Sequence, residues 1–257
     1  MSHPTAGTVY LIGAGPGAAD LLTVRAARLL AEADIVFHDA LVPAAMLALA
    51  PRAEKVAVGK RCGKHATAQA FINKRLVDAA RKHGVVVRLK GGDPMLFGRA
   101  QEEIDALRAA GIRHEIVPGV TAALAAAADL GVSLTRRGLS RNVAFATPRV
   151  GEGERASDWA AALAHADTAA VYMGAGDAAA ITAALVARGK RADLPVVAVE
   201  NASLPEARRW YTTLAELPRL AEEAFTGPVV LLLGEVFGEA VDEAQAVADS
   251  RQRRASA

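Results

Sequence analysis

The amino-acid sequence predicts an α/β protein built from two α/β domains, with a cofactor cleft expected between them. Short runs of β-branched residues alternate with alanine-rich stretches of helical spacing, and this series occurs twice along the chain. A polar, basic segment, SLTRRGLSR, separates the two series. Glycine-rich loops follow two of the early strands, at the end of a parallel sheet where ligands bind. We therefore expect a first domain at 1–135, a linker at 136–142 and a second domain at 143–238.

Five strands joined by helical crossovers are expected in the first domain. Thr23 and Thr67 are suited to begin helices, because a threonine hydroxyl accepts a hydrogen bond from an amide of the first turn. Gly84 and Gly111 are suited to end helices, since glycine tolerates the left-handed conformation found there. The strands are expected at residues 9–12, 35–37, 55–58, 85–89 and 112–117, and the helices at residues 23–30, 67–81 and 98–110.

The second domain repeats the alternation of strands and helices. Its strands are expected at residues 143–146, 168–172, 196–200, 209–213 and 229–233, with a helix at residues 177–188. Residues 239–257 are acidic at first and end in RQRRASA, with little apolar periodicity. Such a segment has few apolar side chains to hold it against a core, so we expect a tail whose end is disordered.

Composition is typical of a globular cytoplasmic protein. The 257 residues are 52% hydrophobic and 23% charged, enough for one large or two modest domains. Cys62 is the only cysteine, so neither an intramolecular disulfide nor a thiolate zinc site is expected. The first residues do not form a signal sequence, and no apolar run approaches the roughly 18 residues of a membrane span. We expect cytoplasmic localisation and no membrane partner.

Charge and aromatic content argue against a nucleic-acid partner. Up to Arg137 the chain carries 18 Lys and Arg against 12 Asp and Glu, and after it 12 against 16. This small basic excess can steer a polyanionic small molecule, but it does not make a nucleic-acid surface, and only 4% of residues are aromatic. The six histidines lack the spacing of metal ligands, so no metal is expected.

The first strand leads into the sequence GAGPG at residues 13–17, where glycines let backbone amides approach a ligand closely. Gly13, Gly15 and Ala18 also fit the loose G-x-G-x-x-A pattern of dinucleotide-binding proteins, so an NAD(P)-dependent oxidoreductase is an alternative. Pro16 has no amide donor, and the next helix is expected to begin well after the last glycine. Both features disfavour a pyrophosphate bound at a helix N-terminus.

A second cluster, RLKGGDPMLFGR at residues 88–99, lies where a buried strand emerges into a loop. Its backbone could bind polar atoms of a cofactor, and the carboxylate of Asp93 could attract an ammonium group. The alternative is a simple Gly-Asp-Pro turn with no ligand. Because both glycine loops follow strand ends, they are expected to line one binding site.

These motifs together resemble those of the uroporphyrinogen-III C-methyltransferases, within the tetrapyrrole methylase family. The resemblance rests on VYLIGAGPG, VGKR, RLKGGDP followed by FGR, and VPGVTAA, in this order and spacing. It covers roughly residues 8–236, and the set is far more specific than any one glycine pattern.

The resemblance implies the tetrapyrrole methylase fold, a homodimer, and S-adenosyl-L-methionine bound between two α/β domains, with S-adenosyl-L-homocysteine as product. It implies methylation of uroporphyrinogen III, twice and via precorrin-1, to precorrin-2. It also implies ten cofactor-binding residues: Pro16, Gly91, Gly92, Asp93, Leu96, Thr121, Ala122, Met173, Ala202 and Val229.

The resemblance points to Asp39 as a proton acceptor and to Lys60 as a proton donor. From the residues alone, Asp39 follows an apolar strand, where partial burial would suit a carboxylate to act as a base; the alternative is a solvated loop carboxylate. Lys60 follows another strand, in GKRCGKH, and could equally pair with substrate carboxylates.

The eight carboxylates of uroporphyrinogen III require a basic site. An arginine can hold a carboxylate with two hydrogen bonds, so Arg61, Arg99 and Arg149 are predicted to bind substrate. Further basic candidates are Lys60, Lys64, Arg136 and Arg137.

Three departures from the family pattern flank the expected site: Thr147-Pro148-Arg149 where Thr-Gly-His is frequent, Arg136-Arg137 where His-Arg is frequent, and Ala202 where Gly is common. They leave open a methyltransferase acting on a later precorrin, or a non-catalytic tetrapyrrole binder. Sirohaem, cobalamin and haem d1 biosynthesis share precorrin-2, so the downstream pathway also stays open. We expect a single activity, since two methylase domains leave no room for a dehydrogenase and chelatase module.

Overall fold

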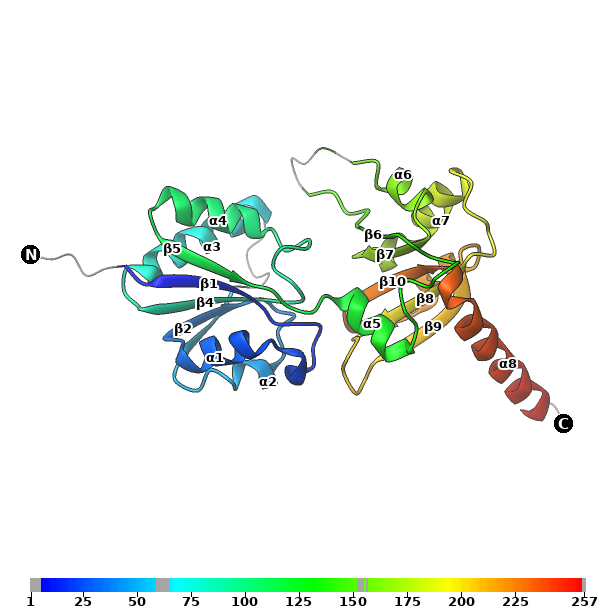
Figure 1. Cartoon of the computed structure of the whole chain (residues 1–257), viewed down its shortest axis with the longest axis horizontal. Helices are drawn as coiled ribbons and strands as arrows, with labels where there is room; N and C mark the ends of the chain where they lie inside the picture. Colours follow the sequence, from blue (N-terminus) through cyan, green and yellow to red (C-terminus); the bar gives the residue numbers. More distant parts are fainter. Residues whose placement is uncertain (1–5, 59–64, 152–154, 156, 256–257) are drawn as a thin grey trace, which may run out of the picture. The chain divides into compact units, whose positions relative to one another are not determined.

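The computed structural model describes residues 6–58, 65–151, 155 and 157–255, with backbone alone at 65–68 and 251–255. Contacts divide the chain into two compact units, Met1–Thr121 and Ala122–Ala257. Each unit contains one five-stranded sheet with helices beside it (Figure 1). The predicted class, two α/β units in succession, is confirmed.

The first unit is a parallel sheet with strand order β3-β2-β4-β1-β5. Its strands are β1 (Thr8–Gly13), β2 (Ile35–His38), β3 (Glu54–Ala57), β4 (Val85–Lys90) and β5 (Arg113–Val117). Its helices are the 3-10 turn η1 (Ala19–Leu21), α1 (Val24–Glu32), α2 (Ala44–Leu47), α3 (His65–Ala80) and α4 (Ala100–Ala109). All five predicted strands and three predicted helices are present. The short α2 and the turn η1 were not predicted.

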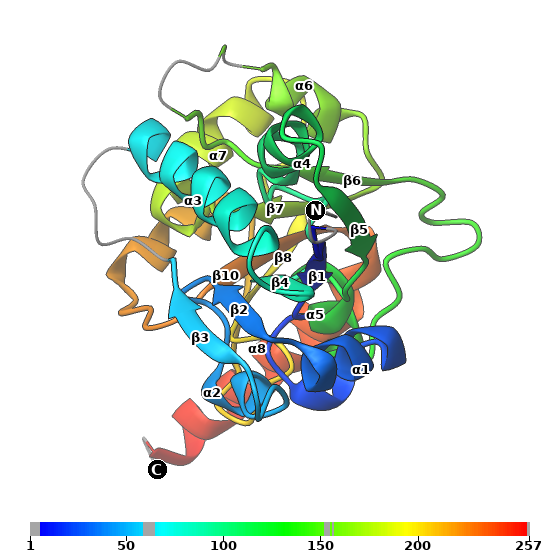
Figure 2. The ribbon, with the colours of Figure 1, turned by 90° about the vertical axis from the view of Figure 1, so that its left-hand side faces the viewer.

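The central strands of this sheet are buried on both faces. Val9 and Leu11 of β1 pack with residues of α3 and α4, whereas Ile12 packs with residues of α1 and α2. Figure 2 shows these two helix pairs on opposite faces of the sheet. Parallel strands covered on both faces are almost continuously apolar, and charged residues on them are therefore exceptional. Two such exceptions, Arg88 and Lys90, lie at the end of β4.

The second unit is a mixed sheet with strand order β6-β7-β10-β8-β9, in which only β6 and β7 are parallel. Its strands are β6 (Val143–Ala146), β7 (Thr168–Tyr172), β8 (Pro195–Glu200), β9 (Arg208–Thr213) and β10 (Val229–Gly234). Its helices are α5 (Ala122–Leu130), α6 (Trp159–Ala164), α7 (Ala178–Val186) and α8 (Gly238–Ala255), with 3-10 turns η2 (Ala175–Asp177), η3 (Leu217–Glu222) and η4 (Glu235–Phe237).

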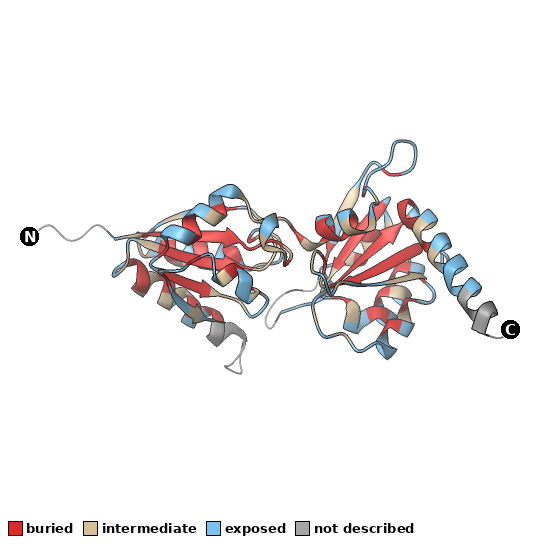
Figure 3. Ribbon diagram, turned by 90° about the horizontal axis from the view of Figure 1, so that it is seen from below, coloured by how far each residue is buried: buried red, intermediate tan, exposed pale blue. Residues whose placement is uncertain are grey.

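Helices cover both faces of this second sheet. Residues of α6, α7 and η3 pack on the face that carries Ala169, Val171 and Leu231. Elsewhere in this unit, α5 contacts β10, and α8 contacts β8 and β9. Figure 3 shows that burial is greatest on the central strands of both sheets.

The segment expected to be the linker, 136–142, belongs to the second unit. Ser140 Oγ lies 2.8 Å from Thr168 Oγ1, and the amide of Arg141 donates to Asp167 at 2.8 Å. Arg136 pairs with Glu239 of α8 at 3.0 Å. These bonds fasten the segment to the start of β7 and to α8. The division between the two units falls earlier, after Thr121.

The expected tail is helical. Its first turn is anchored by Val241, which is 3% exposed, but most described side chains further along α8 are exposed. Among the described helices, none is both long and apolar enough to cross a membrane.

Candidate active site

Three loops converge where β1, β4 and β5 end, because these strands are parallel neighbours. The amide of Gly15 donates to the carbonyl of Gly92 at 3.1 Å, and the amide of Gly92 donates to Gly15 at 2.7 Å. A Cβ on Gly13 would lie 2.6 Å from both the Cα of Gly119 and the carbonyl oxygen of Gly92. The backbones therefore meet where no side chain fits.

The loop after β1 does not lead directly into a helix. Only the three-residue η1 follows the last glycine, and α1 begins at Val24 with the hydroxyl of Thr23 accepting from the Ala26 amide at 3.2 Å. The helix N-terminus that a dinucleotide pyrophosphate needs is therefore displaced from the glycine loop. Pro16 lies half-buried in this loop.

Asp93 joins two of the converging loops. Its Oδ1 accepts from the Met95 amide at 2.8 Å and its Oδ2 accepts from the Gly119 amide at 2.9 Å. Both carboxylate oxygens thus accept hydrogen bonds from backbone amides. The bond from Met95 is the one expected within a Gly-Asp-Pro turn, and the bond from Gly119 couples that turn to the loop after β5. The neighbouring residues Gly91, Gly92 and Leu96 are half-buried.

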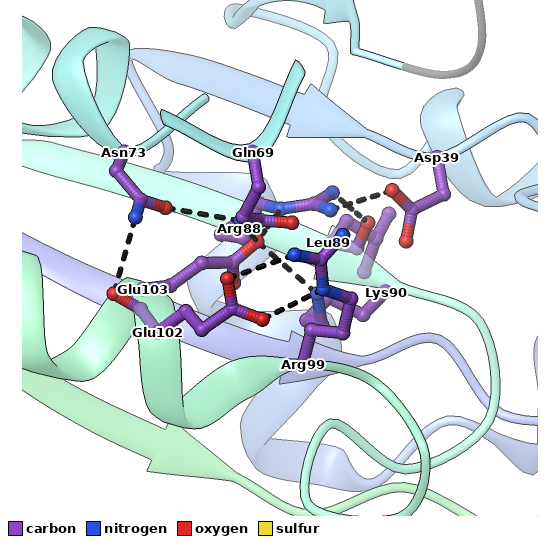
Figure 4. A network of polar contacts seen from close by, with 9 residues as sticks. All are labelled: Asp39, Gln69, Asn73, Arg88, Leu89, Lys90, Arg99, Glu102 and Glu103. Atoms are coloured by element: carbon purple, nitrogen blue, oxygen red, sulfur yellow. Dashed lines mark hydrogen bonds and ion pairs between the residues drawn. The ribbon is translucent and has the colours of Figure 1, made fainter. Parts of the chain in front are cut away.

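A buried ionic network lies beside this loop, on the sheet face covered by α3 and α4 (Figure 4). Glu103 of α4 is fully buried, and its Oε1 accepts from Arg88 Nε at 2.9 Å and from Lys90 Nζ at 3.2 Å. Gln69 of α3 donates to the same oxygen at 3.3 Å. Arg88 Nη2 then donates to Oδ1 of the predicted base Asp39 at 2.5 Å. Asp39, whose side chain is 31% exposed, is the point where the network meets the surface.

Burial and charge act in opposite directions on the two cations. Burial disfavours the charged guanidinium of Arg88, but the carboxylates of Glu103 and Asp39 outweigh it and raise the pKa of Arg88. Burial and the neighbouring Arg88 lower the pKa of Lys90, although Glu103 and Asp39 oppose this. Oε2 of Glu103 is buried without a hydrogen-bond partner among the described residues.

The predicted substrate residues fall in different settings. Arg99 has a left-handed backbone, with φ of 54°, and its half-exposed guanidinium forms two hydrogen bonds with Glu102, at 2.6 and 2.8 Å. Arg149 is exposed in the loop after β6. Lys60 and Arg61 lie outside the described residues, so their predicted roles stay predictions.

In the second unit, three predicted cofactor residues gather at one end of the sheet. Met173 follows β7, Ala202 follows β8 and Val229 begins the antiparallel β10, where it pairs with Glu200. Met173 is 45% exposed with φ of 55°, whereas Ala202 is buried. Asn201 also has a positive φ, of 53°. Left-handed residues other than glycine are uncommon and concentrate at functional sites.

The remaining predicted cofactor residues, Thr121 and Ala122, fall on either side of the division between units. Thr121 is 8% exposed and Ala122 begins α5. The next amide, of Ala123, donates to the hydroxyl of Tyr172 at 3.1 Å, which ties the start of α5 to the end of β7.

Glu200, absent from the sequence prediction, holds the loop before β10 and the start of β9 at the same sheet end. Its buried carboxylate accepts from the amides of Thr226 at 2.5 Å and Gly227 at 2.7 Å, and from Arg208 Nε at 2.6 Å. Burial acts to raise the pKa of Glu200, but these hydrogen bonds outweigh it and lower it. In the sequence, Glu200 could have been recognised as the one charged residue of the otherwise apolar strand PVVAVE. Arg88 and Lys90 were signalled similarly, by charge on a buried strand, whereas Glu103 lies on the helix α4 and had no such signal.

Comparisons with known proteins show which family the chain resembles. Residues 8–218 match the family model of tetrapyrrole (corrin/porphyrin) methylases. A siroheme synthase of Zymomonas mobilis is 44% identical over 237 residues, which cover 92% of this chain and 50% of that protein. The chain thus spans about half the length of the curated relatives it matches.

Unlike the curated relatives, the following two solved structures match this chain over almost their whole length. A uroporphyrin-III C-methyl transferase from Thermus thermophilus, complexed with S-adenyl homocysteine, is 42% identical, with a TM-score of 0.78 and coverage of 90% of this chain and 98% of that one. A cobalt precorrin-4 methyltransferase is 29% identical, also with a TM-score of 0.78, covering 89% and 95%. By sequence and fold, this chain belongs to the tetrapyrrole methylase family.

Proposed function

We propose that this chain transfers methyl groups from S-adenosyl-L-methionine to ring carbons of uroporphyrinogen III, twice and via precorrin-1, to give precorrin-2. The observation that carries the proposal is a carboxylate, Asp39, held by the buried Arg88 beside the glycine loops. The 42% identity to the Thermus thermophilus enzyme over 98% of its length supports the choice of substrate. The siroheme synthases are about twice as long, so only the methylation is proposed.

The cofactor residues fit a methyl donor of this kind. The half-buried backbone of Gly91 and Gly92 can meet polar groups closely, and the strained Met173 extends an exposed thioether side chain. S-adenosyl-L-methionine supplies an electrophilic methyl group when it is bound. The proposed contacts are Pro16, Gly91, Gly92, Asp93, Leu96, Thr121, Ala122, Met173, Ala202 and Val229.

The chain's own chemistry is alignment, charge pairing and proton transfer. A reduced pyrrole carbon is already nucleophilic, so the protein must chiefly orient the reactants. Methylation leaves a cationic ring that regains neutrality by losing a proton, and we assign Asp39 to accept it. Lys60 is proposed as proton donor. Arg61, Arg99 and Arg149 are proposed to bind substrate carboxylates, which for Arg99 requires exchanging its partner Glu102.

Family membership also supports a homodimer as the working assembly, and a cytoplasmic enzyme using small-molecule substrates. Neither nucleic acid nor a metal has a role in this proposal. Precorrin-2 made here could enter sirohaem, cobalamin or haem d1 biosynthesis.

A second candidate is methylation of a later precorrin. The similarity to a cobalt precorrin-4 methyltransferase favours it, as does the departure at Thr147-Pro148-Arg149, directly after β6. Proteins of this fold methylate different tetrapyrroles, so the choice between uroporphyrinogen III and a later precorrin depends on the side chains that contact the substrate.

The deciding experiment is anaerobic incubation of the purified protein with uroporphyrinogen III and S-adenosyl-L-methionine, followed by mass spectrometry. Two added methyl groups are expected. No addition, with measurable S-adenosyl-L-homocysteine binding, would shift the proposal to a later precorrin. Binding of NAD but not S-adenosyl-L-homocysteine would reject methyl transfer.

Two variants separate the proposed roles. Asp93→Ala should weaken S-adenosyl-L-homocysteine binding in calorimetry, because it frees both loops that the carboxylate holds. Asp39→Asn should slow turnover and leave that affinity unchanged. Asp105→Asn, on the exposed side of α4, is the matched control for both, and wild-type turnover in Asp39→Asn would remove Asp39 from the mechanism.

A further inference from the structure

We propose that Glu103 is a positioning residue that fixes the carboxylate of Asp39 through Arg88. This inference rests on the proposed function in one respect, the assignment of Asp39 as proton acceptor. Glu103 is fully buried, so it acts on substrate only through the residues that it holds.

Every nitrogen of the Arg88 guanidinium has a fixed acceptor. Nε donates to Glu103 at 2.9 Å, Nη1 donates to the carbonyl of Leu89 at 3.2 Å, and Nη2 donates to Asp39 at 2.5 Å. Because the planar guanidinium has an acceptor on each of three sides, these hydrogen bonds allow it a single orientation. Figure 4 shows the resulting line from Glu103 through Arg88 to Asp39.

Strand register makes this line possible. Phe37 of β2 pairs with Arg88 of β4, and Asp39 comes two residues after Phe37, directly beyond the end of β2 and on the same side of the sheet. The amide of Asp39 donates to the carbonyl of Leu89 at 3.4 Å, so its backbone is tied to β4 as well. Only Oδ1 of Asp39 meets Arg88, while the side chain keeps 31% exposure.

Charge balance also depends on Glu103. The network contains two cations, Arg88 and Lys90, and two carboxylates, and its side chains are almost fully buried except for Asp39. Neutralising Glu103 leaves an excess positive charge that only Asp39 and solvent can compensate. Arg88 Nε then faces a neutral acceptor in place of a carboxylate, so the guanidinium is held less firmly and the carboxylate of Asp39 loses its fixed direction.

The test is Glu103→Gln, with Asp105→Asn as the matched control on the same helix. We expect kcat to fall on the order of tenfold or more, as misplacement of a reacting group does. The KM for uroporphyrinogen III and the affinity for S-adenosyl-L-homocysteine should change less than about twofold. An unchanged kcat overturns the proposal.

A double-mutant cycle separates positioning from general damage. In an Asp39→Asn background, Glu103→Gln should change the residual rate by less than about twofold, because its effect passes through Asp39. An equal fold loss in both backgrounds overturns the inference, while slow turnover by Asp39→Asn alone keeps the proposed function intact. If Glu103→Gln does not fold, Glu103→Asp, which retains the charge, takes its place in the cycle.

A crystal structure of the Glu103 variant gives a readout independent of turnover. A shift of the Arg88 guanidinium is expected, and with it a shift of the Asp39 carboxylate, whose Oδ1 lies 2.5 Å from Nη2 in the wild type. An unmoved Asp39 contradicts the proposal even if the wild-type protein methylates another tetrapyrrole.

Discussion

Arg88 donates a hydrogen bond from Nη2 to Oδ1 of Asp39, 2.5 Å away, although 49 positions separate them in sequence. The two residues meet because β2 and β4 are parallel neighbours whose carboxyl ends lie together. Arg88 is 3% exposed at its side chain and Asp39 is 31% exposed, so the pair joins the interior to the surface. A buried cation thereby controls the direction of an accessible carboxylate.

Replacing Arg88 with lysine tests this control. Lysine keeps a positive charge but cannot bond three acceptors as a planar fork, so the carboxylate of Asp39 is released. We expect kcat to fall on the order of tenfold and the free energy of unfolding to fall by about 1–3 kcal/mol, measured by steady-state kinetics and urea denaturation. Unchanged kcat with a normal unfolding transition would show that Asp39 needs no partner.

A methyl group at Gly119 should disturb the loop convergence. Its Cβ would approach the carbonyl of Gly92 and the Cα of Gly13 closer than 3.0 Å, and all of these are backbone atoms. Gly119→Ala should therefore lower the free energy of unfolding by about 1–3 kcal/mol and weaken S-adenosyl-L-homocysteine binding.

The control for this change is Gly176→Ala, where the added Cβ would have no described neighbour within 4 Å. Thermal unfolding and calorimetry on the two variants give the comparison. Equal behaviour of both would mean that the close approach at Gly119 relaxes without consequence.

Because Met173 has a left-handed backbone, its replacement is expected to affect protein stability and cofactor binding differently. With φ of 55°, methionine is strained where glycine is not, and its side chain is exposed. Met173→Gly should be more stable than Met173→Ala by about 1 kcal/mol in urea unfolding, yet both should bind S-adenosyl-L-homocysteine more weakly than wild type. Wild-type affinity in both variants would remove Met173 from the cofactor contacts.

Glu200 predicts a pH-dependent contribution to stability. Its folded-state pKa lies below the ordinary value of 4.5, so folding favours the carboxylate, and its stabilisation is present above that value. The stabilisation is lost as pH falls through the lower, folded-state pKa. The wild type should exceed Glu200→Gln by about 1–3 kcal/mol in free energy of unfolding near pH 7.

This difference should shrink steadily below about pH 4.5, as urea denaturation at a series of pH values would measure. Arg208→Lys serves as a comparison that retains the carboxylate. A difference that does not vary with pH would mean that the charge of Glu200 contributes nothing.

Local patterns were enough to predict the strands and the glycine loops. An apolar run on β1 and the lack of Cβ atoms at Gly13 and Gly92 are properties of the residues themselves. Motif order, likewise, was enough to predict the family. The division after Thr121 was not predicted, because α5 is joined to the second unit by hydrogen bonds such as that of Ala123 with Tyr172, which sequence does not display.

Sequence alone therefore determined two α/β units, the loops that follow their strands, and Asp39 as a candidate base. Tertiary structure decided what Asp93 and Glu103 contact: Asp93 holds two loop amides, and Glu103 holds the arginine that orients Asp39. The physical reason is that periodicity and propensity act over a few neighbouring residues. A buried charge, by contrast, must find its partner across the sheet, and strand order and register choose that partner.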